Sequence, residues 1–327
     1  MTIGVQYRQD FTKNTELSHT LNRTTVIDPI KLGDITEANV GVYLDENIPL
    51  SNQWNMNIGV RYDYFKNQYL DKLDNNKKGT ATAGAFFPKF NVYYTPNSSF
   101  QFYLNTGRGF HSNDTRVVVP QGGKDILPAA YGSDLGVIWK PTPRLLINSA
   151  LWYLWLAQEF VYVGDAGVVE PSGKTRRMGI DVSARYQLTD KLFADFDANL
   201  TQPRAIGEAK GEDYLPLAPT LTSIGGLSLY NKTGFNGSLR YRYMGNRPAN
   251  EDYSVTAQGY FVTDLQLNYA QKRYNLGLSI YNLFNKKWKE TQFNTESRLK
   301  NEAQPVEEIH FTAGSPFFAR GSLTVFF

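Results

Sequence analysis

The chain has 327 residues, of which 41% are hydrophobic and 20% are charged, and its formal net charge is +3. The basic residues are spread along the sequence without a cluster, so the charge pattern predicts no nucleic-acid partner. The absence of cysteine excludes thiol catalysis, disulfides and zinc sites built on cysteine. The longest apolar stretch, Leu145 to Leu156, contains Asn148 and Ser149 and is shorter than the roughly 18 residues that a membrane-spanning helix needs.

Polar and apolar residues alternate along most of the chain, which is typical of strands with two different faces. In the segment 194–201, Asp197 and Asn199 share one face, whereas Phe196 and Leu200 share the other. Segments of about 8 to 12 residues with this pattern are long enough to cross a bilayer at a tilt. The predicted strands, about fourteen, are 2–12, 37–49, 54–67, 83–95, 99–109, 131–140, 144–162, 176–188, 192–202, 217–230, 234–244, 259–270, 274–285 and 316–327.

The predicted connections alternate between short turns and long loops. Turns rich in Pro, Asn, Asp and Ser are predicted at 50–53, 95–98, 140–144, 189–191, 231–233 and 270–273. Long loops are predicted at 14–36, 68–80, 110–130, 164–175, 203–216, 245–258 and 286–315, with a helical turn within 286–302. This sorting is typical of outer-membrane barrels. The predicted fold class is therefore all-β, a transmembrane antiparallel β-barrel. The orientation of 144–162 stays open, because both of its faces are apolar.

Several segments resemble the C-terminal part of TonB-dependent outer-membrane receptors. The segment 279–288 (SIYNLFNKKW), followed by 309–316, is similar to the next-to-last strand of these receptors and the long loop after it. The segment 107–116 (GRGFHSNDTR) resembles a sequence that recurs in one group of them, and 42–50 followed by 59–63 resembles a hairpin from the middle of the barrel. In order, these matches cover essentially the whole chain.

The resemblance implies a barrel of about 22 strands around a plug domain, of which this chain would supply the last fourteen or so. Residues 1–327 are then expected to be a partial barrel domain, without the signal peptide, TonB box, plug and first strands. Met1 is followed directly by the strand-like segment 2–8, so no signal peptide is recognised. We expect the first and last strands of such a part to be unpaired with each other.

The resemblance also implies the function and the partners. A receptor of this kind lies in the outer membrane of a Gram-negative cell and takes up a scarce ligand, most often a ferric siderophore and otherwise cobalamin or a sugar. The TonB complex would supply the energy through the plug. The other expected partners are outer-membrane lipid and the barrel-assembly machinery, which would recognise the terminal Phe327.

Two other classes of protein remain as alternatives. A complete 14-stranded passive channel would pair its first strand with its last. A soluble all-β enzyme or lectin would bury its apolar faces against a second sheet. Neither a catalytic constellation nor a nucleophile elbow or phosphate-binding loop is present, so we predict no enzyme activity.

The densest polar cluster follows the strand 99–109 and comprises Arg108, His111, Asn113, Asp114 and Arg116. Arginine forks suit carboxylate and phosphate groups, so the cluster is a candidate site for an anionic ligand. The alternative is hydrogen bonding that orders the loop or joins it to the plug.

Charged residues on the polar strand faces are candidates for the lining of the lumen. They either line a translocation path or pair across strands or with the plug. These candidates are Asp181, Arg185, Asp195, Asp197, Arg240 and Arg242. The three histidines, His19, His111 and His310, fall in or beside predicted loops without the spacing of metal ligands, so we predict no metal site and no cofactor.

Overall fold

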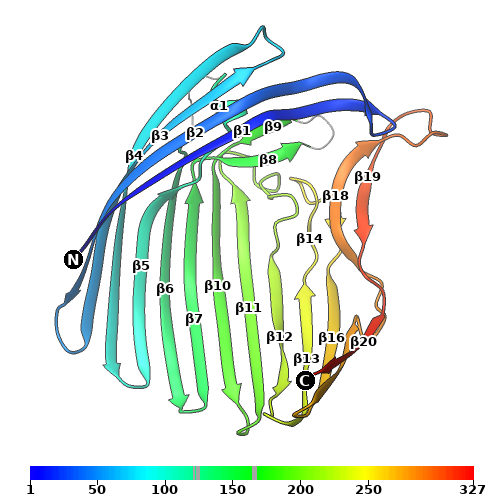
Figure 1. Cartoon of the computed structure of the whole chain (residues 1–327). Helices are drawn as coiled ribbons and strands as arrows, with labels where there is room; N and C mark the ends of the chain where they lie inside the picture. The colour runs from blue at the N-terminus through cyan, green and yellow to red at the C-terminus, as the bar shows by residue number, and fades with distance from the viewer. Residues whose placement is uncertain (121, 123–125, 164–167) are drawn as a thin grey trace. The chain divides into compact units, whose positions relative to one another are not determined.

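The computed structural model describes residues 1–120, 122, 126–163 and 168–327, and these are mostly β-strand (Figure 1). Fourteen of the described strands form one sheet, in sequence order from β1 to β20 at its two ends. They are β1 (Thr2–Leu21), β2 (Thr25–Pro49), β3 (Trp54–Asp71), β4 (Lys77–Asn97), β5 (Phe100–Phe110), β6 (Ala129–Thr142), β7 (Leu145–Leu156), β10 (Thr175–Gln187), β11 (Leu192–Ala205), β12 (Leu221–Leu229), β13 (Gly234–Met244), β16 (Tyr260–Ala270), β17 (Tyr274–Tyr281) and β20 (Phe318–Val325). The all-β class and the number of strands agree with the sequence prediction.

Contacts along the chain divide it into two compact units. The first unit comprises Met1–Tyr94, Leu104–Ser133 and Leu154–Thr175, and the second comprises Thr95–Tyr103, Asp134–Tyr153 and Arg176–Phe327. In the second unit, the short turns between consecutive strands lie along one edge of the sheet (Figure 1). Backbone hydrogen bonds close these turns, such as the one from Gln271 N to Tyr274 O (2.8 Å). This arrangement agrees with the predicted sorting of short turns.

The predicted loop 14–36 is wrong, because β1 and β2 continue through it as a long hairpin. Their pairing runs from Thr2 opposite Asp45 to Leu21 opposite Thr25, with irregularities after Thr12. In the connection of three residues, Asn22 and Arg23 have left-handed φ of 52° and 62°, and Thr24 N donates to Leu21 O (3.2 Å) to close a β-turn. The ladder satisfies the backbone polar groups, so the hairpin needs no continuous apolar face. The ends of the predicted loop 68–80 are likewise strand.

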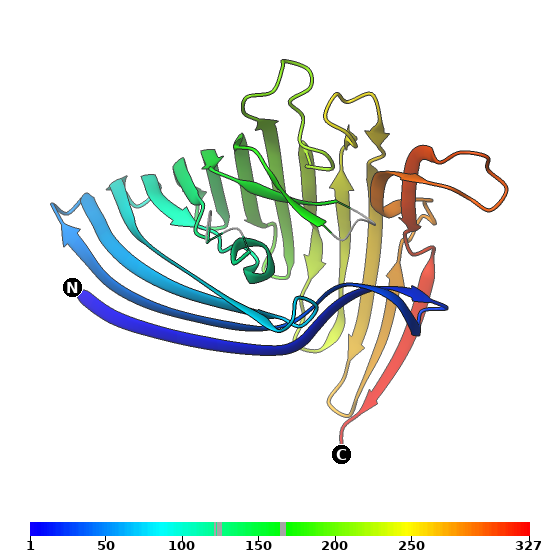
Figure 2. The ribbon, with the colours of Figure 1, turned by 90° about the horizontal axis from the view of Figure 1, so that it is seen from above.

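Three of the longer connections contain a two-stranded hairpin among the described residues. They are β8 (Glu159–Val163) with β9 (Val168–Ser172), β14 (Arg247–Pro248) with β15 (Thr256–Ala257), and β18 (Lys289–Ser297) with β19 (Val306–Ala313). The helical turn predicted within 286–302 is wrong, since β18 pairs there with the β-branched and aromatic residues of β19. Figure 2 shows this hairpin, in orange and red, extending beyond the ends of β16 and β17. Parts of the predicted loops 110–130 and 164–175 lie outside the described residues.

Two other differences concern the middle of the chain. The predicted strand 144–162 is divided into β7 and β8, with Ala157 and Gln158 between them. A single helical turn, α1 (Thr115–Val118), lies in the connection after β5. Its signal in the sequence is Asp114, a residue type that favours the position before a helix. Among the described residues, no helix is long and apolar enough to span a membrane.

The faces of β3 are inverted relative to a soluble protein. Asp63 and Asn67 are 1% and 2% exposed, whereas Val60 and Tyr64 on the opposite face are 41% and 43% exposed. A strand whose polar face is covered and whose apolar face is open suits an apolar surrounding outside the sheet. This inversion follows from the alternation already present in the sequence.

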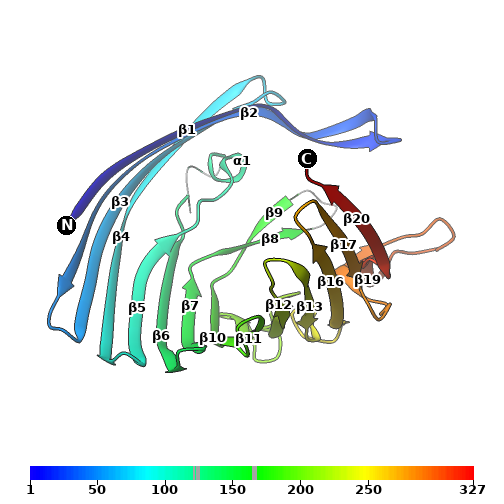
Figure 3. The same ribbon diagram turned by 60° about the horizontal axis from the view of Figure 1, so that its bottom comes forward.

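The second unit repeats this arrangement across many strands, and Figure 3 shows β16, β17 and β20 side by side in sheet order. Leu267 on β16, Leu276 on β17 and Leu323 on β20 are 43%, 47% and 64% exposed. The register places Leu276 opposite Leu323, so these side chains share one open apolar face.

Candidate functional site

The predicted ligand cluster is divided between the end of β5 and the loop that contains α1, all in the first unit. Arg108 lies on β5 and its guanidinium stands over two rings, 5.7 Å from the centre of Phe87 and 5.9 Å from that of Tyr131. His111 is exposed just after β5, at the start of the loop. Arg108 lines a cavity of about 470 Å³ together with Arg61. The two aromatic rings therefore hold the guanidinium of Arg108 by cation–π contacts, and the cavity that Arg108 lines could admit a ligand.

Asp114 and Arg116 are paired with each other. The guanidinium of Arg116 donates to both carboxylate oxygens of Asp114, with Nη2 to Oδ2 at 2.6 Å and Nε to Oδ1 at 3.0 Å, and the backbone N of Arg116 adds a bond of 2.8 Å. Burial raises the pKa of the Asp114 carboxyl, but these hydrogen bonds outweigh it and the pKa lies below its usual range. The arginine fork predicted for a ligand is thus occupied by Asp114, which caps α1.

The rest of the loop is fixed by burial. Asn113 is 3% exposed and its Nδ2 donates to Gln158 Oε1 (2.8 Å), while the hydroxyl of Thr115 donates to Glu37 on β2. Val118 and Val119 pack with Ile126 in a hydrophobic cluster against residues of β3 and β4, namely Tyr69 and Ala81. Asn113, Asp114 and Arg116 are therefore engaged in contacts within the loop. Arg108 and His111, the other members of the cluster, lie where β5 ends and the loop begins.

All six of the predicted lumen-lining charges lie in the second unit, and five of them form ion pairs. Arg185 on β10 donates from Nη2 to both carboxylate oxygens of Asp197 on β11 (2.9 Å each). The guanidinium of Arg242 on β13 lies 3.5 Å from the carboxylate of Asp264 on β16. These pairs are partly exposed, so each contributes little to stability by itself.

The pair between Arg240 and Asp195 spans three strands. Arg240 on β13 donates to Asp195 on β11 through two bonds of 2.7 and 2.6 Å, and Gly226 of β12 lies opposite both residues. A Cβ on Gly226 would overlap the carbonyl oxygen of Leu239 and lie 3.0 Å from the Cα of Arg240. Glycine therefore lets the arginine side chain pass over the middle strand.

The first unit contains the same arrangement. Asp45 of β2 and Lys89 of β4 form an ion pair, and Gly59 of β3 lies opposite both of them in the register. A Cβ on Gly59 would lie 2.6 Å from the Cε of Lys89. In both units, a glycine in the middle strand thus allows an ion pair between second-nearest strands.

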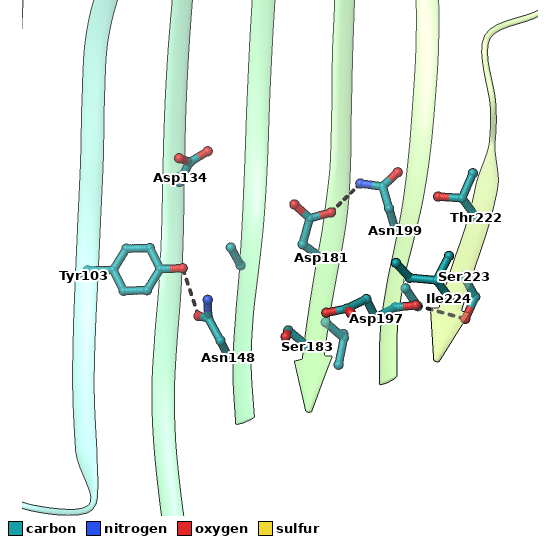
Figure 4. Close-up of a pocket in the computed structure, with 13 residues that line it drawn as sticks. Tyr103, Asp134, Asn148, Asp181, Ser183, Asp197, Asn199, Thr222, Ser223 and Ile224 are labelled. Carbon is teal, nitrogen blue, oxygen red and sulfur yellow. Dashed lines mark hydrogen bonds between the residues drawn. The ribbon is translucent and has the colours of Figure 1, made fainter. Parts of the chain in front are cut away.

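Asp181 lies in a polar groove of about 560 Å³ on the second unit, which Asp197 of the Arg185 pair also lines (Figure 4). Its carboxylate accepts hydrogen bonds from Asn199 and from Trp152 Nε1 (3.1 Å). At the other side of the groove, the hydroxyl of Tyr103 donates to Asn148 (3.1 Å). The groove could accept a polar or cationic group.

Sequence reasoning missed Tyr103, Asp134 and Asn148, which line this groove from β5, β6 and β7. The alternation places Asp134 on a polar face, but the sequence does not give the register that brings Asp134 into one groove with Tyr103 and Asn148. The predicted assembly signal, Phe327, is fully exposed at the end of the chain, beyond β20. His19 lies in β1, and His310 lies in β19 with Nε2 2.9 Å from Ser297 Oγ.

The comparisons with known proteins agree with this geometry. The family model described as TonB dependent receptor-like, β-barrel matches residues 1–283. The ferrioxamine receptor of Yersinia enterocolitica is 22% identical over 237 residues, which cover 68% of this chain and 31% of that protein. The structure of the ferric citrate transporter FecA in its unliganded form aligns with a TM-score of 0.77 and 17% identity, over 99% of this chain and 51% of FecA.

The ferric yersiniabactin uptake receptor FyuA of Yersinia pestis has a TM-score of 0.75 and 16% identity, over 99% of this chain and 51% of FyuA. The chain thus spans about half the length of these solved structures and less than a third of the length of the ferrioxamine receptor. The solved structures share its fold, which confirms the predicted barrel class. Because the family model matches most of the sequence, the chain belongs to the TonB-dependent receptor-like β-barrel family.

Proposed function

We propose that the chain is the C-terminal barrel part of a receptor in the outer membrane of a Gram-negative cell, and that this receptor takes up a ferric chelate with energy from the TonB complex. The family match carries the proposal, and the named relatives add the substrate class, since their names specify ferrioxamine, ferric citrate and ferric yersiniabactin. The open apolar face of the strands fits a lipid surrounding. The proposal assigns binding and transport to the chain, and no catalysis.

The polar faces and the loop with α1 have separate roles in this proposal. The ion pairs of Arg185, Arg240 and Arg242 keep the lumen wall polar and its strands in register. Arg108 and His111 contact the chelate at the loop, while Asn113, Asp114 and Arg116 hold the loop in place. The plug and the remaining strands would come from the rest of the receptor.

Cells that rely on the full receptor for iron should accumulate radiolabelled iron from its chelate only when TonB is present. Replacing Arg108 and His111 together by alanine should weaken chelate binding about tenfold or more, because the hydrogen-bond donors of a guanidinium and an imidazole would be lost. Arg144→Ala is the control, since Arg144 lies in a short turn and pairs with Asp190 (2.9 Å). Uptake without TonB would instead favour the passive channel, as would hydrogen-exchange protection showing β1 bonded to β20.

The terminal Phe327 gives a second prediction, about assembly. Deleting Phe327 from the full receptor should strongly lower its level in the outer membrane, because we propose that the assembly machinery recognises the terminal aromatic residue. Val325→Ile, a conservative change in β20, should leave the level unchanged. Quantitative immunoblots of outer-membrane fractions measure the level of both variants. Normal levels after the deletion would mean that Phe327 is only an aromatic residue at the membrane–water interface and not an assembly signal.

A further inference from the structure

A second cavity, of about 580 Å³, lies in the second unit at the start of the β18–β19 hairpin. Lys286, Lys287 and Lys289 line it, together with Trp288 and Phe311. The lining contains no carboxylate, and within the described part of the chain none of the three ammonium groups has an ion pair. The cavity therefore combines a concentrated positive charge with aromatic surface.

The backbone that carries these lysines is fixed by Asn282, which is 3% exposed. Asn282 Nδ2 donates to the carbonyl oxygens of Lys286 (2.8 Å) and Ser315 (3.0 Å), and its Oδ1 accepts from the backbone N of Lys286 (2.8 Å). Gln292, which is 2% exposed, exchanges two hydrogen bonds with the backbone of Gln258 on the other side of the cavity. The cavity is thus preorganised before any ligand enters.

Trp288 is held in the same way. Its Nε1 donates to Ser315 O (3.0 Å), and its ring lies against Tyr260 with centres 4.8 Å apart. The guanidinium of Arg242 stands 5.6 Å from the centre of the indole, and Lys289 Nζ stands 4.4 Å from the centre of Phe311. Positive charge therefore lies next to both aromatic rings of the cavity.

A buried cation nearby points to the same chemistry. Arg247 on β14 is 6% exposed, and among the described residues its Nη1 has no hydrogen-bond partner. It lies opposite Ala257 in the β14–β15 pairing, and the next residue, Gln258, lines the cavity. A buried guanidinium without an anion is costly, so negative charge in this region would stabilise it.

We propose that this cavity binds the anionic, oxygen-rich part of the ferric chelate, through carboxylate or catecholate groups. This inference rests on the proposed function and names the substrate class: a chelate with net negative charge. Lys286, Lys287 and Lys289 supply the attracting charge, and Trp288 supplies the surface for a planar group. All residues of the site belong to the second unit, and none of them belongs to the cluster of Arg108 and His111.

The test compares the full receptor with a variant in which all three lysines are replaced by glutamine, both in outer-membrane vesicles. The probes are ferric citrate, the ferric complex of the tris-catecholate enterobactin, and ferrioxamine, whose hydroxamates leave no net negative charge on the chelate. The variant should bind at least one of the two anionic chelates tenfold or more weakly, and added salt should weaken binding to the unmodified receptor. Lys272→Gln, in the short turn between β16 and β17, is the matched control and should bind like the unmodified receptor.

Each outcome decides a different question. Unchanged binding of the anionic chelates by the variant would overturn the cavity as their site. If ferrioxamine is the only chelate bound, and the variant and the unmodified receptor bind it equally, the cavity is not a site for anionic chelates. The proposed function would still stand in that case. Failure of all three probes to bind the unmodified receptor would count against the proposed function itself. If the variant loses bound lipopolysaccharide but keeps its affinity for the chelates, the cavity holds a lipid phosphate and the proposal is wrong.

Discussion

Leu200→Arg should lower the free energy of unfolding by about 2–4 kcal/mol in a phospholipid bilayer, which is the cost of a cationic side chain on the lipid face near the membrane centre. Leu200 lies near the middle of β11 and is 54% exposed. Its neighbour Asn199 lies on the other face, where it lines the groove and donates to Asp181. Asn199→Arg should cost much less, because the new cation would meet Asp181 and Asp197 in a polar surrounding.

Both variants can be measured by refolding the full receptor into bilayers of a single phospholipid and titrating with denaturant. The pair is well matched, since the two positions are consecutive on one strand and receive the same side chain. Equal losses of stability for the two variants would show that the faces do not differ in their surroundings. That result would remove the physical basis of the membrane assignment.

The strands could be predicted because their signal is local. A period of two assigns Asn199 and Leu200 to different faces whatever the neighbouring strand is. The ends of the strands were less predictable, as the hairpin through 14–36 shows. There the pairing of β1 with β2 extends the strands without an apolar face, and only the register reveals it.

The candidate site was predictable where its partners are close in sequence. Asp114 and Arg116 are two residues apart, so a sequence can suggest both their pairing and the helical turn that begins after Asp114. The cavity of Lys286 and Trp288 depends instead on Gln258, in the connection before β16, and on Phe311, in β19. Three neighbouring lysines in a predicted loop would ordinarily be solvated on all sides, and only the fold shows that they line a cavity.

Glycine positions carry information of the same non-local kind. From the sequence alone, Gly226 would be expected to weaken its strand. The register, however, places Gly226 between Asp195 and Arg240. Gly59 stands in the same way between Asp45 and Lys89. The sequence contains both glycines and all four charged residues, but the pairing of second-nearest strands is visible only in the structure.

Gly226→Ala should therefore destabilise the refolded receptor by about 1–3 kcal/mol, the usual cost of inserting a methyl group where there is no room for it. The added Cβ would overlap the Leu239 carbonyl oxygen and lie 3.2 Å from the Cγ of Arg240. Gly109→Ala on β5 is the matched control, because β4 and β6 flank this strand and a Cβ there would meet no atom within 4 Å. It should be neutral or slightly stabilising, since alanine loses less backbone entropy than glycine on folding.

A double-mutant cycle separates the crowding of the backbone from the effect on the ion pair. If Gly226 serves to let Arg240 reach Asp195, the cost of Gly226→Ala should be smaller by about 0.5 kcal/mol or more when Arg240 is already alanine. Denaturant titrations of the four proteins in bilayers give the coupling energy. A full cost of Gly226→Ala in both backgrounds would mean that the glycine serves only the packing of β12 against β13. A measurable coupling would mean that the ion pair between Arg240 and Asp195 depends on the absence of a side chain at position 226.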